Sequence, residues 1–564
     1  MRISKEQALA LRIQLFLILL FTAIILGLYL LNKGEGSATV YWVLFPVCLF
    51  IIPKAWLKDV KTTWLHWWDM DRENTRRLLL TMLAATVAFS MATYLFAFTN
   101  EFFNHDAISA VYYPEITTSW FAAGRPLLAI FNTLSGTVQQ PWLLGMQFML
   151  WMFLASILVA RILHIQSTIG RVLLCGLLCA NTSLSNLFAH YTFCASAYAL
   201  ALMAIIAAAW LFCCCRRGEI LGIYCIVFSM LIYQAYFIAG VALCFFAAVR
   251  MLVCNENARL VVLRGVRYLA LLAAGFLAYY LTWSALCHIF GVTKQRLSDI
   301  TISYGLDYFL KRFVGSFSHF FSTHLSSEDF LGRMAPAVKL LVMIMILFWL
   351  LCWLMDKRLA KSNKVLLSLS VCMLPLVLNL SYALFDMGNL TLVNVSMGFL
   401  GAFLLHCLSC PAPAAPASRR YQVAAFLLTA VLLWQNIVYS NSVYIKMDLN
   451  KEATVSLFTR VIERVEQTEG YVPGETPVAF SGNPNRNSFL SRGRKGYEWL
   501  NDTTGVSWYN YSASWTVTQY VELYLNYPMN IVNAPNSEEI VGMPVFPFDG
   551  SVGWVDGVIV VKMS

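Results

Sequence analysis

The feature that most constrains this chain is a series of apolar stretches, each about twenty residues long, that recurs from residue 13 to residue 440. A hydrocarbon core about 30 Å thick is crossed by roughly 20 helical residues, so such stretches can span a membrane. The composition agrees, because 59% of the residues are hydrophobic and only 12% are charged, which is far more apolar than in soluble proteins. We therefore expect a polytopic α-helical membrane protein. About thirteen spans are predicted, at residues 13–32, 37–53, 78–98, 141–161, 172–189, 193–213, 220–234, 236–253, 268–290, 335–355, 365–384, 390–408 and 421–440.

The distribution of Lys and Arg predicts the orientation. The net charge is +10, but these residues gather in short loops between alternate spans rather than in one basic patch, which argues against nucleic acid binding. Placing the loops richer in Lys and Arg in the cytoplasm puts the N-terminus inside and the C-terminus outside. In a Gram-negative cell the outer side is the periplasm. The first apolar run, 13–32, is long for a signal peptide and lacks a clear cleavage pattern, so we expect it to be retained.

The span positions divide the chain into two expected domains. Residues 1–440 are predicted to form a transmembrane domain with two long outer loops, 99–140 and 291–334. Residues 441–564 contain no apolar stretch of spanning length and are predicted to form a small α/β domain outside the membrane.

The C-terminal tail shows helix and strand signals of its own. Apolar residues recur at helical spacing in 451–469, and short β-type runs follow at 477–480 and 558–561. All 15 Cys lie in or beside apolar spans and none lies in the tail, which excludes a disulfide framework there.

The positions of the acidic residues bear on the class of function. Outside the tail, every Asp and Glu falls in a predicted loop or at a span end. Ion-coupled transporters usually keep a carboxylate inside the membrane, so this pattern disfavours a polysaccharide or lipid-linked sugar transporter or flippase. That class and a non-catalytic membrane scaffold or glycan-binding protein remain as alternatives to an enzyme.

The first long outer loop brings acidic, basic and aromatic residues together near the membrane surface. It contains Glu101, Asp106 and Glu115, and Arg125, set between Gly and Pro, is its only basic residue. A carboxylate can take a proton from an acceptor hydroxyl while a guanidinium neutralises a departing phosphate, which suits sugar transfer from a lipid phosphate. The alternative is that Asp106 is a solvated loop residue and Arg125 anchors a head group. Further substrate-binding candidates in this loop are His105, Tyr112, Tyr113 and Trp120.

The second outer loop has aromatic residues at near-helical spacing, which predicts amphipathic helices lying on the membrane. Lys311 and Arg312 are candidates for holding a lipid phosphate there, and surface anchoring is the alternative. His319 and His324 lack a third ligand in register, so no metal site is predicted.

A basic and aromatic cluster lies in the tail. Arg492, Arg494, Lys495 and Trp499 fall in or beside a Gly-, Asn- and Ser-rich stretch, and an exposed loop of this kind could bind an acceptor glycan. A packed small-domain core with a solvated loop is the alternative.

These motifs resemble the bacterial serotype-converting O-antigen glucosyltransferases (GtrII-like), which belong to the GT-C superfamily. The resemblance rests on Asn104-His105-Asp106 in the first outer loop, on Trp120, on Gly124-Arg125-Pro126-Leu127, and on the strand Pro477-Val478-Ala479 with Gly482. Members often show paired acids followed by Gly-Arg, whereas here a single Asp is followed by Ala-Ile-Ser, so Asp106 could act alone or with Glu101 or Glu115.

The resemblance implies an activity and its partners. It implies a GT-C-like transmembrane enzyme of the bacterial inner membrane whose donor is undecaprenyl phosphate glucose. The enzyme would transfer the glucose, with inversion at the anomeric carbon, to lipid-linked O-antigen repeats of lipopolysaccharide. This transfer would cause serotype conversion. A glucosyl-lipid synthase and a flippase would supply this donor on the periplasmic side. Asp106 would be the general base, and Arg125, helped by Lys311 or Arg312, would stabilise the departing phosphate. No cofactor is implied, the use of a divalent cation stays open, and no Walker-type phosphate loop is present.

Overall fold

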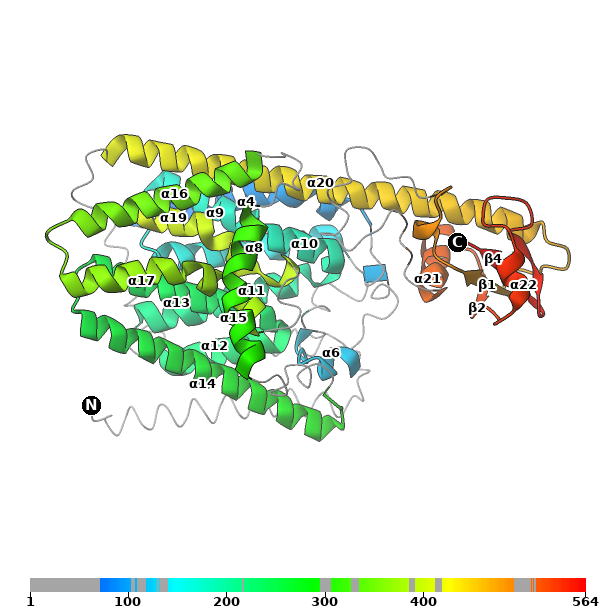
Figure 1. The fold of residues 1–564 in the computed structure, drawn as a ribbon, viewed down its shortest axis with the longest axis horizontal. Helices are drawn as coiled ribbons and strands as arrows, with labels where there is room; N and C mark the ends of the chain where they lie inside the picture. Colours follow the sequence, from blue (N-terminus) through cyan, green and yellow to red (C-terminus); the bar gives the residue numbers. More distant parts are fainter. Residues whose placement is uncertain are drawn as a thin grey trace.

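The computed structural model describes residues 72–102, 107–108, 118–128, 131, 140–215, 218–294, 306–325, 334–384, 391–410, 418–490, 509, 511 and 514–564. The expected spans 13–32 and 37–53 lie outside these residues. In the described part, long helices dominate, and one small sheet forms near the C-terminus (Figure 1).

Eight helical segments of the described residues are long and apolar enough to cross a membrane. They are Thr75–Thr99, Pro141–Ile162, Thr168–Cys214, Gln234–Val253, Ala258–Phe290, Pro336–Met355, Lys361–Leu378 and Arg420–Glu466, and two shorter apolar helices are Glu219–Ile232 and Val395–Ser409. Most of these helices run along the long axis of the molecule (Figure 1). A mostly helical fold with several helices of spanning length and composition is therefore confirmed, whereas the total of thirteen spans stays a prediction.

The centre of the bundle is a nearly continuous helical run, Thr168–Cys214, in which the expected spans 172–189 and 193–213 both fall. It contains α9 (Thr168–Cys179), α10 (Thr182–Tyr191) and α11 (Ala195–Cys214). Asn181 caps α10 through its side chain, and the 3-10 turn η2 (Thr192–Cys194) separates α10 from α11. Because α11 is apolar on all sides, it is buried nearly all round. It packs against α8 (Pro141–Ile162), α12 (Glu219–Ile232) and α13 (Phe237–Val253).

Helix α14 (Ala258–Phe290) lies at the edge of the bundle. In its most apolar 18-residue stretch only 22% is buried, whereas 78% is buried in the corresponding stretch of Thr168–Cys214. Its buried face carries Tyr279 and Trp283, while Leu277 and Leu281 are exposed on the other side. An exposed apolar helix face of this kind fits contact with lipid.

Helix α15 (Leu306–Leu325) runs across the direction of α14, α16 (Met334–Met355) and α17 (Lys361–Leu378). Figure 1 shows this crosswise orientation. It packs against α16, α17 and the short α18 (Leu380–Leu384). The amphipathic helix predicted in the second outer loop is thus present, and its position on a membrane surface stays a prediction.

A single helix of 49 residues, α20 (Ser418–Glu466), connects the bundle to the C-terminal part. At 1.5 Å per residue it is about 74 Å long, more than twice the thickness of a hydrocarbon core. It packs against α4 (Arg72–Thr99), α9, α10, α16 and α19 (Leu400–Ser409) in the bundle, and against α21 (Ser514–Leu525) beyond it. The helix expected at 451–469 is therefore not separate, and the expected domain boundary at 440/441 falls inside α20.

The C-terminal part is built around a four-stranded sheet with the order β2-β1-β4-β3. Its strands are β1 (Pro477–Ser481), β2 (Asn530–Val532), β3 (Val552–Val555) and β4 (Val558–Lys562), and the short helix α22 is Glu538–Gly542. β1 is parallel to β2 and β4, with Ala479 opposite Val532 and Val560, and β3 and β4 form an antiparallel pair. The β-type runs predicted at 477–480 and 558–561 match β1 and β4. Phe458, near the C-terminal end of α20, packs edge-on against Phe480 of β1.

Candidate functional site

The structure describes five of the residues proposed from the sequence: Glu101, Trp120, Arg125, Lys311 and Arg312. The others lie outside the described residues, and their predicted roles stay predictions. They are His105, Asp106, Tyr112, Tyr113, Glu115, Arg492, Arg494, Lys495 and Trp499.

Arg125 follows a tight turn at the end of the short helix α6 (Thr118–Ala122). Gly124 has a φ of +81°, in the left-handed region that favours glycine. A Cβ at this position would also collide with the hydroxyl of Tyr279 and the side-chain amide of Gln234. The turn is closed by the backbone N–H of Arg125, which donates to the carbonyl of Trp120 at 2.9 Å. Glycine at 124 is therefore required by both conformation and space.

Side chains from two other elements satisfy the carbonyl groups of this turn. Gln234, in the 3-10 turn η3 (Gln234–Tyr236), donates from Nε2 to the carbonyl of Ala123 at 2.7 Å. Tyr279 of α14 donates its hydroxyl to the carbonyl of Gly124 at 3.1 Å, and Trp283 donates Nε1 to the carbonyl of Phe121 at 2.9 Å. Because a buried carbonyl needs a donor, these three side chains fix the turn against α14 and η3.

The guanidinium of Arg125 is held by neutral and aromatic groups. Its Nε donates to Oε1 of Gln234 at 3.2 Å, and its Cζ lies 4.8 Å from the ring centroid of Tyr233. Burial alone would lower the pKa of Arg125, but the neighbouring phenol groups, with Tyr198 and Tyr233 first, outweigh this and raise it. Among the described residues no carboxylate forms an ion pair with Arg125. The site therefore contains a charged guanidinium without an acidic partner in the described part of the chain, an arrangement that suits an anionic ligand.

Trp120 supports this turn through its ring as well as its carbonyl. The indole is half-buried and stacks on Phe193 of η2, with ring centroids 6.0 Å apart and an angle of 16° between the planes. The described contacts thus give Trp120 a positioning role toward Arg125.

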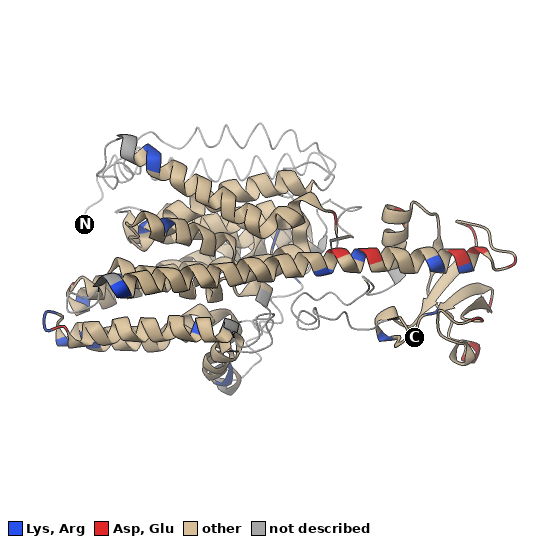
Figure 2. Ribbon diagram, turned by 90° about the horizontal axis from the view of Figure 1, so that it is seen from above, with Lys and Arg blue, Asp and Glu red and all other residues tan. Residues whose placement is uncertain are grey.

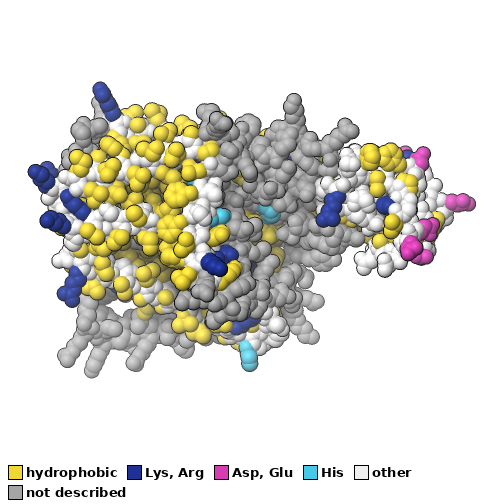
Figure 3. Space-filling model, viewed as in Figure 1, with side chains coloured by type: hydrophobic (Ala, Val, Ile, Leu, Met, Phe, Trp, Pro, Cys, Tyr) yellow, Lys and Arg dark blue, Asp and Glu magenta, His cyan; other side chains and the backbone are white. Residues whose placement is uncertain are grey.

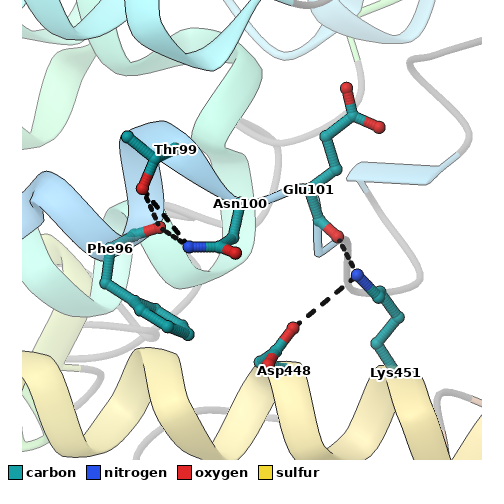
Figure 4. A network of polar contacts seen from close by, with 6 residues as sticks. All are labelled: Phe96, Thr99, Asn100, Glu101, Asp448 and Lys451. Atoms are coloured by element: carbon teal, nitrogen blue, oxygen red, sulfur yellow. Dashed lines mark hydrogen bonds and ion pairs between the residues drawn. The ribbon is translucent and has the colours of Figure 1, made fainter.

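Glu101 lies where α4 leads into the first outer loop, and its backbone is tied to α20. Its carbonyl accepts a hydrogen bond from Nζ of Lys451 at 2.9 Å, and Lys451 also pairs with Asp448 at 3.6 Å. Figure 4 shows the Glu101 carboxylate directed away from Lys451. The contacts place Glu101 beside α20 and do not bring its carboxylate to Arg125.

Arg312 belongs to a separate cluster formed by α15 and α18. Its Nε donates to the carbonyl of Tyr382 at 2.9 Å, its Nη1 donates to the hydroxyl of Tyr308 at 3.2 Å, and it lies over the Tyr382 ring at 4.8 Å. Lys311 is exposed on α15. None of the contacts described for these two residues reaches the Gly124–Arg125 turn.

The two histidines of α15 contact aromatic and amide side chains. His319 stacks on the Tyr382 ring at 4.4 Å, and its Nδ1 lies 3.0 Å from Nδ2 of Asn379. His324 is buried against Phe320, and burial, with the nearby charge of Lys339, lowers the pKa of His324 to about 3. No group of three or more His, Cys, Asp or Glu residues that could hold a metal ion occurs in the described ranges.

Sequence reasoning missed the residues that hold Arg125 in place. Gln234 lies between two apolar helices, and Tyr279 and Trp283 are four residues apart and so on one face of an expected span. A polar residue at a span end and two aromatic residues with polar atoms on one face were the available signals. Neither signal indicates that these side chains contact the first outer loop.

Comparison with known proteins assigns a family to the part of the chain that contains the Gly124–Arg125 turn. Residues 95–405, more than half of the chain, match the family model described as glucosyl transferase GtrII. No curated protein and no solved structure matches the chain. The matched range contains the Gly124–Arg125 turn, α14 and α15, and it ends before α20 and the sheet.

Proposed function

The chain belongs to the GtrII glucosyl transferase family, and we propose that it transfers glucose from undecaprenyl phosphate glucose to the O-antigen repeats of lipopolysaccharide. The reaction takes place at the periplasmic face of the bacterial inner membrane and changes the serotype of the cell. The family and the membrane-type helices support a membrane-bound glucosyltransferase, and the donor, the acceptor and the side of the membrane are our proposals.

The observation that carries the proposal is the guanidinium of Arg125, which has no acidic partner among the described residues. The neighbouring phenol groups raise the pKa of Arg125, so the guanidinium stays charged, and its described partners are an amide and a phenol ring, with no acid among them. A glycosyl phosphate donor supplies an anion for this charge, and its phosphate gains negative charge as it leaves. The turn that presents Arg125 is fixed by three hydrogen bonds from α14 and η3, which favours electrostatic stabilisation of this kind.

In the proposed mechanism, Asp106 accepts the proton of an acceptor hydroxyl. The acceptor oxygen attacks the anomeric carbon of glucose from the side opposite the phosphate, so the new C–O bond forms as the bond to the phosphate oxygen breaks. The configuration inverts, undecaprenyl phosphate leaves, and Arg125 stabilises it. Glu101 and Glu115 are candidate partners of Asp106, and His105, Tyr112 and Tyr113 are candidate donor contacts.

The remaining sequence-derived candidates have more peripheral roles in this proposal. Lys311 and Arg312 would hold lipid phosphate groups at the outer surface, where α15 crosses the bundle. The tail residues Arg492, Arg494, Lys495 and Trp499 would bind the acceptor glycan. The polyprenyl chain stays in lipid while the polar acceptor approaches from water, which explains a site at the outer end of the spans.

The proposal is tested in a host that makes a defined O antigen and also contains a glucosyl-lipid synthase and a flippase. We expect the wild-type chain to add one hexose per repeat, measured by mass spectrometry of the released polysaccharide. Asp106→Asn and Arg125→Ala should reduce the addition to a small fraction of the wild-type level, and Lys361→Met, at the exposed start of α17, should not change it.

Two outcomes contradict the proposal. If the wild-type chain adds no hexose although the donor lipid is present, the assigned function is wrong. If both variants are expressed and add hexose as well as the wild type, the assigned site is wrong.

A further inference from the structure

A second cation, Lys294, lies beside the elements that hold Arg125. Its Nζ is 4.8 Å from the ring centroid of Tyr280 and 5.2 Å from that of Trp283, and it donates to the hydroxyl of Ser284. Trp283 is fully buried, whereas Tyr280 is 37% exposed. The ammonium therefore lies at the boundary between the bundle interior and its surroundings.

The end of α14 explains how Lys294 reaches this place. Gly291 has a φ of +65° and ends the helix in the left-handed conformation, and the N–H of Val292 donates to the carbonyl of Cys287 at 2.9 Å. This cap turns the chain back, so that Lys294 contacts side chains two to three turns before the end of the helix. The aliphatic part of a lysine is long enough to lie along such a surface while its ammonium contacts the rings.

A continuous set of contacts connects Lys294 with Arg125. Trp283 stacks on Tyr279 with an angle of 9° between the rings, and Nε2 of Gln234 donates to the hydroxyl of Tyr279 at 2.9 Å. The same Gln234 side chain accepts from Nε of Arg125 at 3.2 Å. Lys294 and Arg125 thus share one support, the face of α14 that carries Tyr279 and Trp283.

The charge of Lys294 is not compensated by an acid in the part of the chain that the structure describes. Its contacts there are a hydroxyl and two aromatic rings, and those of Arg125 are an amide and one ring. Other cations form ion pairs, for example Arg264 with Glu256 and Arg464 with Asp549. Two cations supported by one helix face, both held by neutral groups, form a region suited to an anionic ligand.

We propose that Lys294 is a second cation of the donor site and binds the anionic phosphate head group of the lipid-linked sugar together with Arg125. The inference rests on the function proposed above and adds a residue that the motifs did not indicate. An ammonium acts as a point charge with three donors, and among the described residues one of them is used by Ser284, which leaves two for phosphate oxygens there. Tyr280, on the exposed side, marks the side from which a membrane lipid reaches the pair.

The test measures binding to the full-length chain in nanodiscs of phosphatidylcholine. The probes are undecaprenyl phosphate, uncharged undecaprenol and phosphatidylglycerol, and the readouts are the thermal shift and the Kd. We expect undecaprenyl phosphate to stabilise the wild type more than the other two probes do. Lys294→Met should weaken its binding by about tenfold or more, the usual loss for a hydrogen bond to a charged group. Lys294→Arg should restore most of the affinity, and Lys361→Met should bind like the wild type.

The outcomes separate this inference from the proposed function. If undecaprenyl phosphate binds the wild type no better than undecaprenol does, the proposed donor class fails, and the role of Lys294 fails with it. If it does bind better but Lys294→Met, folded by its thermal transition without ligand, binds equally well, only the role of Lys294 is overturned. Equal stabilisation by phosphatidylglycerol would show a general lipid contact and would also overturn the inference.

The turnover of the same variants provides a second readout. Loss of a donor-binding charge should raise the KM for the donor more than it lowers kcat, because the phosphate is bound both before and during the reaction. A fall in kcat alone would contradict the binding role of Lys294.

Discussion

The cationic side chains at the two ends of α14 have different kinds of partner. At its N-terminal end, Arg264 pairs with Glu256 at 2.7 Å and Arg267 pairs with Glu219, and both arginine side chains are 48% exposed. At its C-terminal end, Tyr279 and Trp283 hold the turn before Arg125, and Lys294 lies over Tyr280 and Trp283 without an acidic partner among the described residues. Figure 1 places this second end on the same side of the bundle as α6 and the C-terminal sheet.

The distribution of charge over the described residues is also uneven. Figure 2 shows both acidic and basic residues on the C-terminal part of α20, and mainly Lys and Arg at the opposite end of the bundle. Figure 3 shows basic side chains at one edge of the apolar belt and acidic side chains on the far end of the C-terminal part. This arrangement supports the proposed orientation, in which the end of the bundle where Lys and Arg gather faces the cytoplasm.

The comparison indicates that the ion-paired arginines and the cations without a described acidic partner have different roles. An exposed ion pair contributes little to stability, and its cations are explained by topology. Arg125 and Lys294 are held by an amide, a hydroxyl and aromatic rings, with no acidic partner among the described residues, and such cations suit an anionic ligand. We therefore expect substitutions at the C-terminal end of α14 to change ligand binding and turnover, and those at the N-terminal end to change almost nothing.

The largest expected effect is that of removing the guanidinium. Arg125→Ala should lower kcat/KM by about 10²–10³-fold, because it removes a preorganised donor from the departing phosphate. Arg264→Ala, the matched change at the other end, should stay within about twofold. The measurement is glucosyl transfer by purified protein at varied donor concentration. Similar losses in both variants would show that the two ends of α14 are equivalent.

A change of pH tests the cost of a positive charge at His324 of α15. Burial lowers the pKa of His324 to about 3, while an unfolded His has a pKa near 6.5. Between these values the unfolded state binds more protons, so stability is complete above pH 6.5 and falls as the pH falls toward 3. At pH 5 the loss is about 2 kcal/mol.

The control for this prediction is His324→Leu, which removes the titrating group. Between pH 7 and pH 5, the Tm of the wild type should fall more than the Tm of the variant. An equal fall in both proteins would mean that His324 becomes charged in the folded state without cost.

The sequence predicted Arg125 but not its surroundings, and the reason is physical. Gly124 and Pro126 mark a turn in the local sequence, and a single Arg in an outer loop is visible without structural information. The contacts with Gln234 and Tyr279 join residues more than a hundred positions apart, and they depend on how α6, η3 and α14 pack. No local pattern contains that information.

The long helix α20 shows a signal that hydropathy alone does not use. Its apolar stretch ends near residue 440, and a window that seeks twenty apolar residues reads the following polar residues as a break. Residues 418–466 nevertheless contain neither Pro nor Gly, so nothing in the backbone ends the helix. The strands β1 and β4 were predictable from their runs of β-forming residues, whereas β2 has only three residues and gave no clear signal.

Adding an acidic partner for Arg125, like those of the arginines at the N-terminal end of α14, should have a smaller effect than removing Arg125. Gln234→Glu places a carboxylate beside Arg125 with almost no change in shape, so Arg125 gains an ion pair that competes with the phosphate. The KM for the donor should rise by about tenfold, as expected for the loss of one charge-assisted interaction. Gln234→Leu, which removes the amide without adding charge, controls for the lost hydrogen bonds to Ala123 and Tyr279. If Gln234→Glu and Gln234→Leu raise the KM equally, charge compensation is not the cause.

The smallest effect is expected at Arg267, the ion-paired cation at the N-terminal end of α14. Its side chain is about half exposed, and such pairs contribute roughly 0.2–1 kcal/mol. Arg267→Met should therefore shift the Tm by no more than about 2 °C and leave the KM for the donor unchanged. Glu219→Gln should give the same small shift, and the double variant should show little beyond the sum of the two. A clear rise in the KM for the donor in either variant would mean that the paired end of α14 also contributes to the site, and the contrast between the two ends would be lost.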